Sequence, residues 1–413
     1  MPMRTPLPCL VGAAVVSTAI GCGPTAPAEW TIGPRPLESP AGANSSEPQL
    51  SVSDRGVLLS WIERVGTTTT LKFSERTTSG WTTPVAAAAG PDWFLSYADV
   101  PSVQRMANGT LVAQFLPTTD DLTEAYDLLI SYSSDEGKTW AMPFMPHHDG
   151  TKTQHGFASM FDMQGGGLGL VWLDGRNSEF TDDPESGTMM LRFASFDTNW
   201  KQTADVENDH RVCECCQTTA VATADGVLTA FRDRDANEVR DIGVSRLESG
   251  SWTPTTLVSQ DDWMIDACPV NGPMLSARGR DVAAAWFTVK DDLGQAYVAF
   301  SGDAGRNWDE PIRVDDAGSL GRVDVDLLDD GSALVSWVEY DQGASDFKVR
   351  RVEKTGARSA AIAVAGVSGG RASGFPKMAR RGNELTFAWS GSATPEGDAQ
   401  GSLQVFTATA TLP

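Results

Sequence analysis

The sequence predicts an all-β protein folded as a seven-bladed β-propeller. A pattern made of a glycine-containing turn, an alternating apolar run and a large aromatic residue recurs along the whole chain. A tryptophan with a proline shortly after it follows many of these repeats, and helical periodicity is nearly absent. Each repeat therefore holds about four short strands joined by tight turns. Four-stranded units in radial repetition form a β-propeller.

The first pattern gives the number of blades. Its aromatic residues are Trp61, Phe115, Trp172, Phe231, Trp286, Trp337 and Trp389, which lie 54, 57, 59, 55, 51 and 52 residues apart. A period this regular predicts seven equivalent units, with a six-bladed ring as the fallback. The tryptophan–proline pattern occurs between them, in "GWTTP", "TWAMP", "SWTP" and "NWDEP".

The two ends of the chain are expected to complete one blade together. The last repeat stops at "LQVFTATATLP", about one strand short of a full blade. The missing strand matches "EWTIGPRPL", where Trp30 and Pro34 repeat the tryptophan–proline pattern. We expect this N-terminal strand to close the ring, because closure removes an open sheet edge. Residues 30–413 then form a single domain.

The first residues resemble an export signal. Arg4 supplies positive charge, and residues 7–20 are mostly apolar but too few to span a bilayer. The sequence "AIGC" ending at Cys22 resembles a bacterial lipobox, which implies a lipid on Cys22, and an ordinary signal peptide is the alternative. Residues 1–22 would be the signal and residues 23–29 a tether. The protein would be an exported lipoprotein facing the periplasm or the cell exterior.

The charge balance restricts the partners. The chain has 54 acidic against 32 basic residues, for a net charge of −22. Phosphate backbones and anionic lipid repel such a protein, so nucleic acid is excluded as a partner and the membrane is reached only through the N-terminal lipid. We expect a monomer that needs no cofactor.

Two segments carry a family resemblance. "SSDEGKTW" (residues 133–140) and "SGDAGRNW" (residues 301–308) are similar to the Asp-box of sialidase-like, BNR-repeat β-propellers, many of them exported bacterial proteins. The resemblance implies that Asp135 and Asp303 cap turn amides rather than take part in chemistry. The Phe/Tyr-Arg-Ile-Pro motif of true sialidases is absent. The resemblance therefore indicates the architecture and leaves the activity open.

In propellers of this kind, ligands bind the face opposite the Asp-boxes. That face is built from the loops leading into the innermost strands and the loops after the second strands. These loops carry candidate residues for an anionic ligand, namely Arg176, Arg232, Arg234, Arg322, Arg371 and His155. The alternative for the arginines in "FRDRDANEVRD" is a rim of ion pairs that neutralise one another. Asp99 and Asp174 are candidate acid/base residues if the protein is a hydrolase.

The cysteines are concentrated in "RVCECCQTT". Cys216 and Cys268 are 52 residues apart, about one repeat, so they should lie on neighbouring blades. In an oxidising compartment we expect disulfides among Cys213, Cys215, Cys216 and Cys268, with the pairing left open. The alternatives are a zinc or Cu(I) site formed by these cysteines with His210, or a redox site.

Three functions follow from these candidates. The first is binding of a glycan, another anionic ligand or an envelope protein at the channel mouth of blades 3 to 7. The alternative is a glycan-acting hydrolase, a sialidase-like exo-glycosidase. The third is a periplasmic metal-binding protein that uses the cysteine cluster.

Overall fold

The computed structural model describes residue 1 and residues 30–120, 125–178, 187–392 and 402–413. The expected signal peptide and tether, with the lipidation site Cys22, fall almost entirely within residues 2–29 and so lie outside the described residues. Within the described part, no helix is long and apolar enough to cross a membrane.

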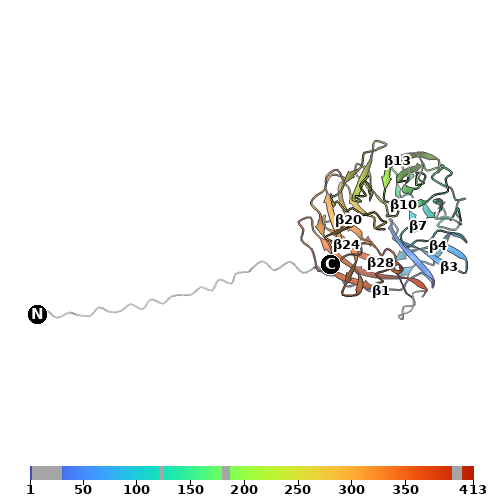
Figure 1. The fold of residues 1–413 in the computed structure, drawn as a ribbon. Coiled ribbons are helices and arrows are strands. Elements are labelled where there is room, and N and C mark those ends of the chain that lie inside the picture. The colour runs from blue at the N-terminus through green and yellow to red at the C-terminus, as the bar shows by residue number, and fades with distance from the viewer. Residues whose placement is uncertain (2–29, 121–124, 179–186, 393–401) are drawn as a thin grey trace.

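Seven antiparallel sheets are arranged radially around one axis, which confirms the predicted seven-bladed β-propeller (Figure 1). Blade 1 contains β2 (Ser45–Val52), β3 (Val57–Val65), β4 (Thr68–Thr77), β5 (Gly80–Trp81) and β6 (Val85–Gly90). Blade 2 contains β7 (Ser102–Arg105), β8 (Leu111–Phe115) and β9 (Leu129–Ser133). Blade 3 contains β10 (His155–Asp162), β11 (Leu168–Asp174), β12 (Met189–Phe196) and β13 (Gln202–Val212).

The remaining blades follow in chain order. Blade 4 contains β14 (Thr219–Thr223), β15 (Gly226–Arg232), β16 (Ile242–Glu248), β17 (Ser251–Trp252) and β18 (Thr256–Leu257). Blade 5 contains β19 (Met274–Arg278), β20 (Asp281–Lys290), β21 (Leu293–Ser301) and β22 (Ile312–Arg313). Blade 6 contains β23 (Asp324–Leu327), β24 (Ala333–Asp341), β25 (Ala344–Val352) and β26 (Ile362–Gly366). A 3-10 turn, η1 (Arg371–Ser373), leads into blade 7, which contains β27 (Lys377–Arg381), β28 (Glu384–Ser392) and β29 (Leu403–Thr411).

The N-terminal strand closes the ring as predicted. The strand β1 (Arg35–Leu37) pairs antiparallel with β29, with Arg35 opposite Thr409 and Leu37 opposite Thr407. Trp30 packs against the apolar cluster between blades 6 and 7. The last blade is therefore assembled from both ends of the chain, which leaves no open edge on β29.

The core is a series of apolar layers between neighbouring blades. Trp61, Trp172, Trp286 and Trp337, which end the repeated aromatic pattern, are fully buried. Trp337, for example, belongs to a cluster shared by blades 5 and 6, and Trp172 to one shared by blades 2 and 3. Truncating such a side chain typically costs about 3–5 kcal/mol.

Blade 2 departs from the expected four strands. Its outer segment meets β9 at a single bridge between Ile130 and Phe144. Pro143 and Pro146 flank this bridge. Proline has no backbone N–H to donate, so a longer ladder cannot form there.

Asp135 and Asp303 serve the turns in which they lie. Asp135 accepts hydrogen bonds from the backbone N–H and the hydroxyl of Thr139, at 2.9 and 2.7 Å. Asp303 accepts from the backbone N–H and side-chain amide of Asn307, at 2.9 and 2.6 Å. The hydrogen bonds to Asp135, above all those from Thr139, hold the pKa of the Asp135 carboxyl at about 2.

Candidate ligand-binding face and axial cavity

Residues at or just before the start of five innermost strands share an unusual backbone conformation. Glu47, Phe157, Val270, Arg322 and Gly374 have φ values of 58°, 52°, 49°, 55° and 57°. They occupy equivalent positions in five of the blades, and only one of them is glycine. Left-handed backbone at non-glycine residues is uncommon and concentrates at functional sites. This end of the ring is also where the sequence places the ligand-binding face.

Arg232 is built into this face rather than exposed on it. It is 1% exposed, and its guanidinium donates to the carbonyl oxygens of Asn271, Arg240 and Phe287 at 2.8, 2.5 and 2.6 Å. It also lies 4.9 Å from the ring centre of Trp263. Arg232 therefore ties blade 4 to blade 5, and its hydrogen-bonding capacity is used within the protein.

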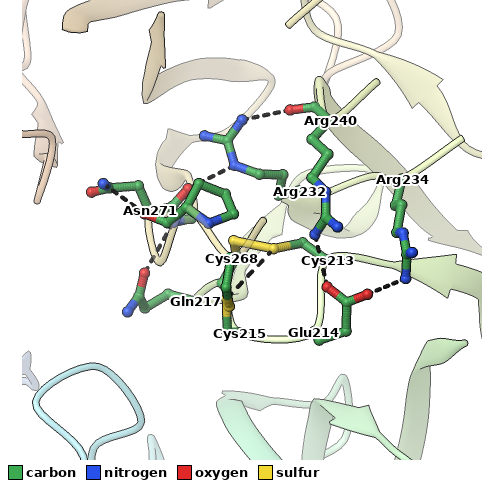
Figure 2. The surroundings of a disulfide bond; sticks show 12 residues. Cys213, Glu214, Cys215, Gln217, Arg232, Arg234, Arg240, Cys268 and Asn271 are labelled. Carbon is green, nitrogen blue, oxygen red and sulfur yellow. Dashed lines mark hydrogen bonds and ion pairs between the residues drawn. A yellow bond between two sulfur atoms is a disulfide. The ribbon is translucent and has the colours of Figure 1, made fainter. Parts of the chain in front are cut away.

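Arg234 belongs to a rim of ion pairs. It contacts Glu214 and donates to Glu238 at 2.7 Å. Arg240 donates to Glu214 at 2.7 Å (Figure 2). It also donates to Glu238 at 2.9 Å. Two guanidiniums and two carboxylates balance one another, as the rim interpretation of the sequence expects. Glu214, which lies between the cysteines, was not among the predicted site residues.

The four cysteines form two disulfides in the structure. Cys213 is joined to Cys216, and Cys215 to Cys268, with Cα–Cα distances of 5.8 and 6.1 Å. Cys215, rather than its neighbour Cys216, reaches across to the loop that leads into blade 5 (Figure 2). The three close cysteines do not gather His210 as a fourth ligand.

Asp174 and Arg176 form a closed pair. Asp174 is fully buried and accepts from Arg176 Nε at 2.7 Å, Arg176 Nη2 at 2.8 Å and Trp172 Nε1 at 2.9 Å. Burial alone would raise the pKa of Asp174, but the hydrogen bonds from Arg176 hold it below the usual value. An ionised carboxylate paired in this way is a poor general acid.

Of the five predicted ligand-binding arginines, only Arg371 is exposed. Arg322 is buried, donates to the carbonyl of Gly370 at 2.8 Å and contacts the Ser373 hydroxyl, so it holds η1 in place. Arg371 lies over the ring of Tyr97 at 5.6 Å. Tyr97 immediately precedes residues that line the axial cavity. Arg371 and Tyr97 thus place a cation and an aromatic ring next to the segment that enters the cavity wall at Ala98 and Asp99.

A cavity of about 250 Å³ lies between the innermost strands. Its polar lining consists mainly of uncharged side chains, namely Gln49, Ser51, Ser102, Gln104, Ser159, Gln217, Thr218 and Thr219. The charged residues in the lining are Asp99 and Lys377. Burial lowers the pKa of Lys377, and the charge of nearby Asp324 opposes this.

Asp99 is held rigidly at the cavity wall. It is 1% exposed and accepts from the Tyr126 hydroxyl and the Phe157 backbone N–H, both at 2.7 Å. Burial raises the pKa of Asp99 to about 6 despite these bonds. A Cβ atom on Gly156 would lie 2.0 Å from Asp99 Oδ2, so only glycine fits beside this carboxyl.

Glu47 is a second buried carboxyl that sequence reasoning missed. It is 8% exposed, and its Oε2 has no hydrogen-bond partner within the described part of the chain. Burial raises the pKa of Glu47 to about 8, and the negative charge of Asp99 adds to the shift. The available signal was its equivalence with Phe157 and Arg322 in the repeat, which places it at the same end of the ring.

The predicted candidates thus separate into three groups. Arg232, Arg234 and Arg322 are used in contacts within the protein. Asp99 and Arg371 lie at or beside the axial cavity. Asp174, Arg176 and His155 are gathered at the junction of blades 2 and 3, where His155 Nε2 lies 3.8 Å from Asp174 Oδ1. His155 does not line the axial cavity.

Comparison with known proteins finds similarity at the level of structure. No protein-family model matches the sequence, and no curated protein matches it. A protein of unknown function from Dyadobacter fermentans DSM 18053 superposes with a TM-score of 0.51 at 14% identity, covering 94% of this chain and 98% of that one. The polysaccharide lyase Uly1 superposes with a TM-score of 0.50 at 9% identity, covering 89% and 90%. The NanB sialidase of Streptococcus pneumoniae, as its K499G mutant, gives 0.49 at 10% identity, covering 86% and 84%. At these identities the first two structures establish a shared β-propeller fold and nothing finer.

Proposed function

We propose that the protein is an exported, lipid-anchored β-propeller that binds a glycan in its axial cavity, which the glycan enters from the predicted ligand-binding face. The observation that carries this proposal is the lining of the cavity. Amide and hydroxyl side chains outnumber charged ones in it, and such groups match the hydroxyls of a sugar. A volume of about 250 Å³ suits roughly one sugar ring. Uly1, which shares the fold, is by its name a polysaccharide lyase.

Fewer arginines are left to bind an anionic ligand than the sequence predicts. Arg232, Arg234, Arg322 and Arg176 donate to groups of the protein itself. Arg371 is exposed beside Tyr97, and Lys377 is buried in the cavity wall. A sugar with one carboxylate or sulfate would find its counter-charge at Arg371, while a neutral sugar would use the amides and hydroxyls.

The test is binding to an immobilised glycan panel, with Arg371→Ala compared against Arg381→Ala. Arg381 is also exposed but lies at the end of β27, on the opposite face of the ring. The proposal expects weaker binding of acidic glycans for Arg371→Ala and no change for Arg381→Ala. Equal effects of the two substitutions would contradict a ligand at the mouth.

A glycan-acting hydrolase is the second candidate, and one observation favours it. Asp99 and Glu47 are two coupled, buried carboxyls whose raised pKa values, about 6 and about 8, differ from each other. Carboxyls with separated pKa values are the usual arrangement for acid/base catalysis. At neutral pH Glu47 would hold its proton while Asp99 is mostly ionised. Turnover of the glycan that binds, lost in Glu47→Gln while binding remains, would establish this activity.

Export and lipid anchoring are tested separately. Cys22→Ser should move the protein from the membrane fraction to the soluble fraction of the producing cell. Retention in the membrane fraction after this substitution would contradict the lipid anchor.

A further inference from the structure

A second cluster of ionisable side chains lies at the junction of blades 2 and 3. None of its members, His147, His155, Asp127 and Asp149, lines the axial cavity. Backbone hydrogen bonds bring the segments together, since the His155 N–H donates to the Tyr126 carbonyl at 3.1 Å. Asp127, which follows Tyr126, is thereby placed beside the histidines.

The two imidazole rings are stacked and face a carboxylate on each side. The ring centres of His147 and His155 are 3.9 Å apart with an angle of 4° between the planes, and both residues are buried. On one side, His155 Nε2 and His147 Nδ1 lie 3.2 and 3.5 Å from Asp149 Oδ2. On the other side, His147 Nε2 and His155 Nδ1 lie 3.9 and 4.0 Å from Asp127 Oδ1.

Asp149 determines where the ring protons sit. It accepts from the Thr151 backbone N–H at 2.9 Å and lies 3.2 Å from the Arg176 guanidinium, so its oxygens act as acceptors. The N–H of each ring therefore points to Asp149. This leaves lone pairs on His147 Nε2 and His155 Nδ1, which are buried and have no hydrogen-bond partner among the described residues. Buried acceptors without a partner are rare in folded proteins.

We propose that His147 Nε2, His155 Nδ1 and Asp127 bind one divalent transition-metal ion. Zinc is the ion that matches this ligand set best. Two imidazole nitrogens and one carboxylate oxygen are a ligand set suited to zinc, with a fourth position left for water or a ligand. The three atoms lie within 4.8 Å of one another. Bonds of about 2.0–2.1 Å place tetrahedral ligand atoms about 3.4 Å apart, so the three atoms must move inward by about half an ångström. The two rings, which are parallel within 4°, must also tilt out of their stack so that both in-plane lone pairs point at the ion.

The outer surroundings fit the same assignment. Asp149 would be the second carboxylate that orients both metal-binding histidines. Among the described residues, no lysine or arginine forms an ion pair with Asp127, and its ionic contacts are with the two histidines. The alternative group of Asp149, His155 and Asp174 is already occupied by a cation, because Arg176 lies 2.7 Å from Asp174 and 3.2 Å from Asp149.

The experiment is a zinc titration of the mature chain, with affinity measured by competition against a chromophoric chelator. The variants are Asp127→Asn, which is nearly isosteric, and His147→Gln. The matched control is His148→Gln, because His148 is the next residue in the chain, is exposed and lies 3.0 Å from Gln202 Oε1. The wild type and the control should bind one zinc per chain, and both variants should lose at least about tenfold in affinity.

A measurement on the wild type alone keeps the proposal testable if the variants fold poorly. With cobalt in place of zinc, imidazole and carboxylate ligands give visible d–d bands without the ultraviolet charge-transfer band of thiolates. The proposal is overturned if the wild type binds no zinc at micromolar concentrations, or if folded variants bind it as tightly as the wild type. A thiolate band, or loss of binding after alkylation of thiols, would assign the metal to the cysteines and overturn it as well. Because zinc binding is read directly, the result is independent of whether a glycan binds at the axial cavity.

Discussion

The hydroxyl of Tyr126 donates a 2.7 Å hydrogen bond to Asp99 at the wall of the axial cavity. Tyr126 is 1% exposed and stacks on Phe94, with ring centres 4.0 Å apart. The carboxyl is therefore oriented by a side chain that is itself fixed by packing. This is the arrangement by which a rigid scaffold positions a binding or catalytic group.

Tyr126→Phe should leave the packing intact and remove one of the two donors to Asp99. Loss of a hydrogen bond to a buried charge typically costs about 1–3 kcal/mol of folding free energy. The pKa of Asp99, already raised by burial, should rise further because the donor that opposes burial is lost. Denaturant unfolding and carboxyl titration by NMR measure the two effects. Unchanged stability together with an unchanged pKa would show that this hydrogen bond does not hold Asp99.

The buried carboxyl of Glu47 should make the protein less stable as the pH rises. Its pKa is about 8 in the folded protein against 4.5 as the ordinary value, mainly through burial. Between these values the folded state keeps a proton that the unfolded state releases, so stability falls as pH rises from about 5 to 8. Glu47→Gln has no such proton. Over that interval its free energy of unfolding should therefore rise relative to that of the wild type, on the order of a few kcal/mol. Unfolding curves at pH 5, 7 and 8.5 test this, and parallel pH profiles for the two proteins would contradict it.

The cysteine pairing predicts the result of a thiol count. Under denaturing, non-reducing conditions, Cys213, Cys215, Cys216 and Cys268 of the exported protein should give no free thiol. Removing the long bridge by Cys215→Ser should cost about 4 kcal/mol, because that bridge has a sequence separation of 53 residues. Cys268→Ser should cost a similar amount, and the double variant little more. Several free thiols accompanied by bound copper or zinc would instead favour the metal-binding alternative for the cysteine cluster.

The architecture was predictable because its signals are local. Strand alternation, turn glycines and the recurring aromatics such as Trp61 and Trp337 repeat with a near-constant period. The pairing of β1 with β29 was predictable as well, because one strand was missing at one end and present at the other.

The site was less predictable because its properties depend on contacts between distant residues. Nothing local distinguishes Arg232, whose partners are backbone carbonyls of blades 4 and 5, from exposed Arg371. A one-residue difference in register decides that Cys215 rather than Cys216 reaches Cys268. The burial of Glu47 follows from a bulge in β2 and from a long-range hydrogen bond. The Glu47 backbone N–H donates to the hydroxyl of Ser390, 343 residues away.

The central claim, that a glycan enters the axial cavity, is tested most directly by filling the cavity. Ser51 lines it, whereas the next residue, Val52, is 49% exposed and does not. Binding of the wild type, Ser51→Phe and Val52→Phe to the same glycan panel should be measured on folded protein. The account predicts that Ser51→Phe lowers affinity at least about tenfold while Val52→Phe binds as the wild type does. Undiminished binding by Ser51→Phe, or no glycan bound by the wild type, would contradict it.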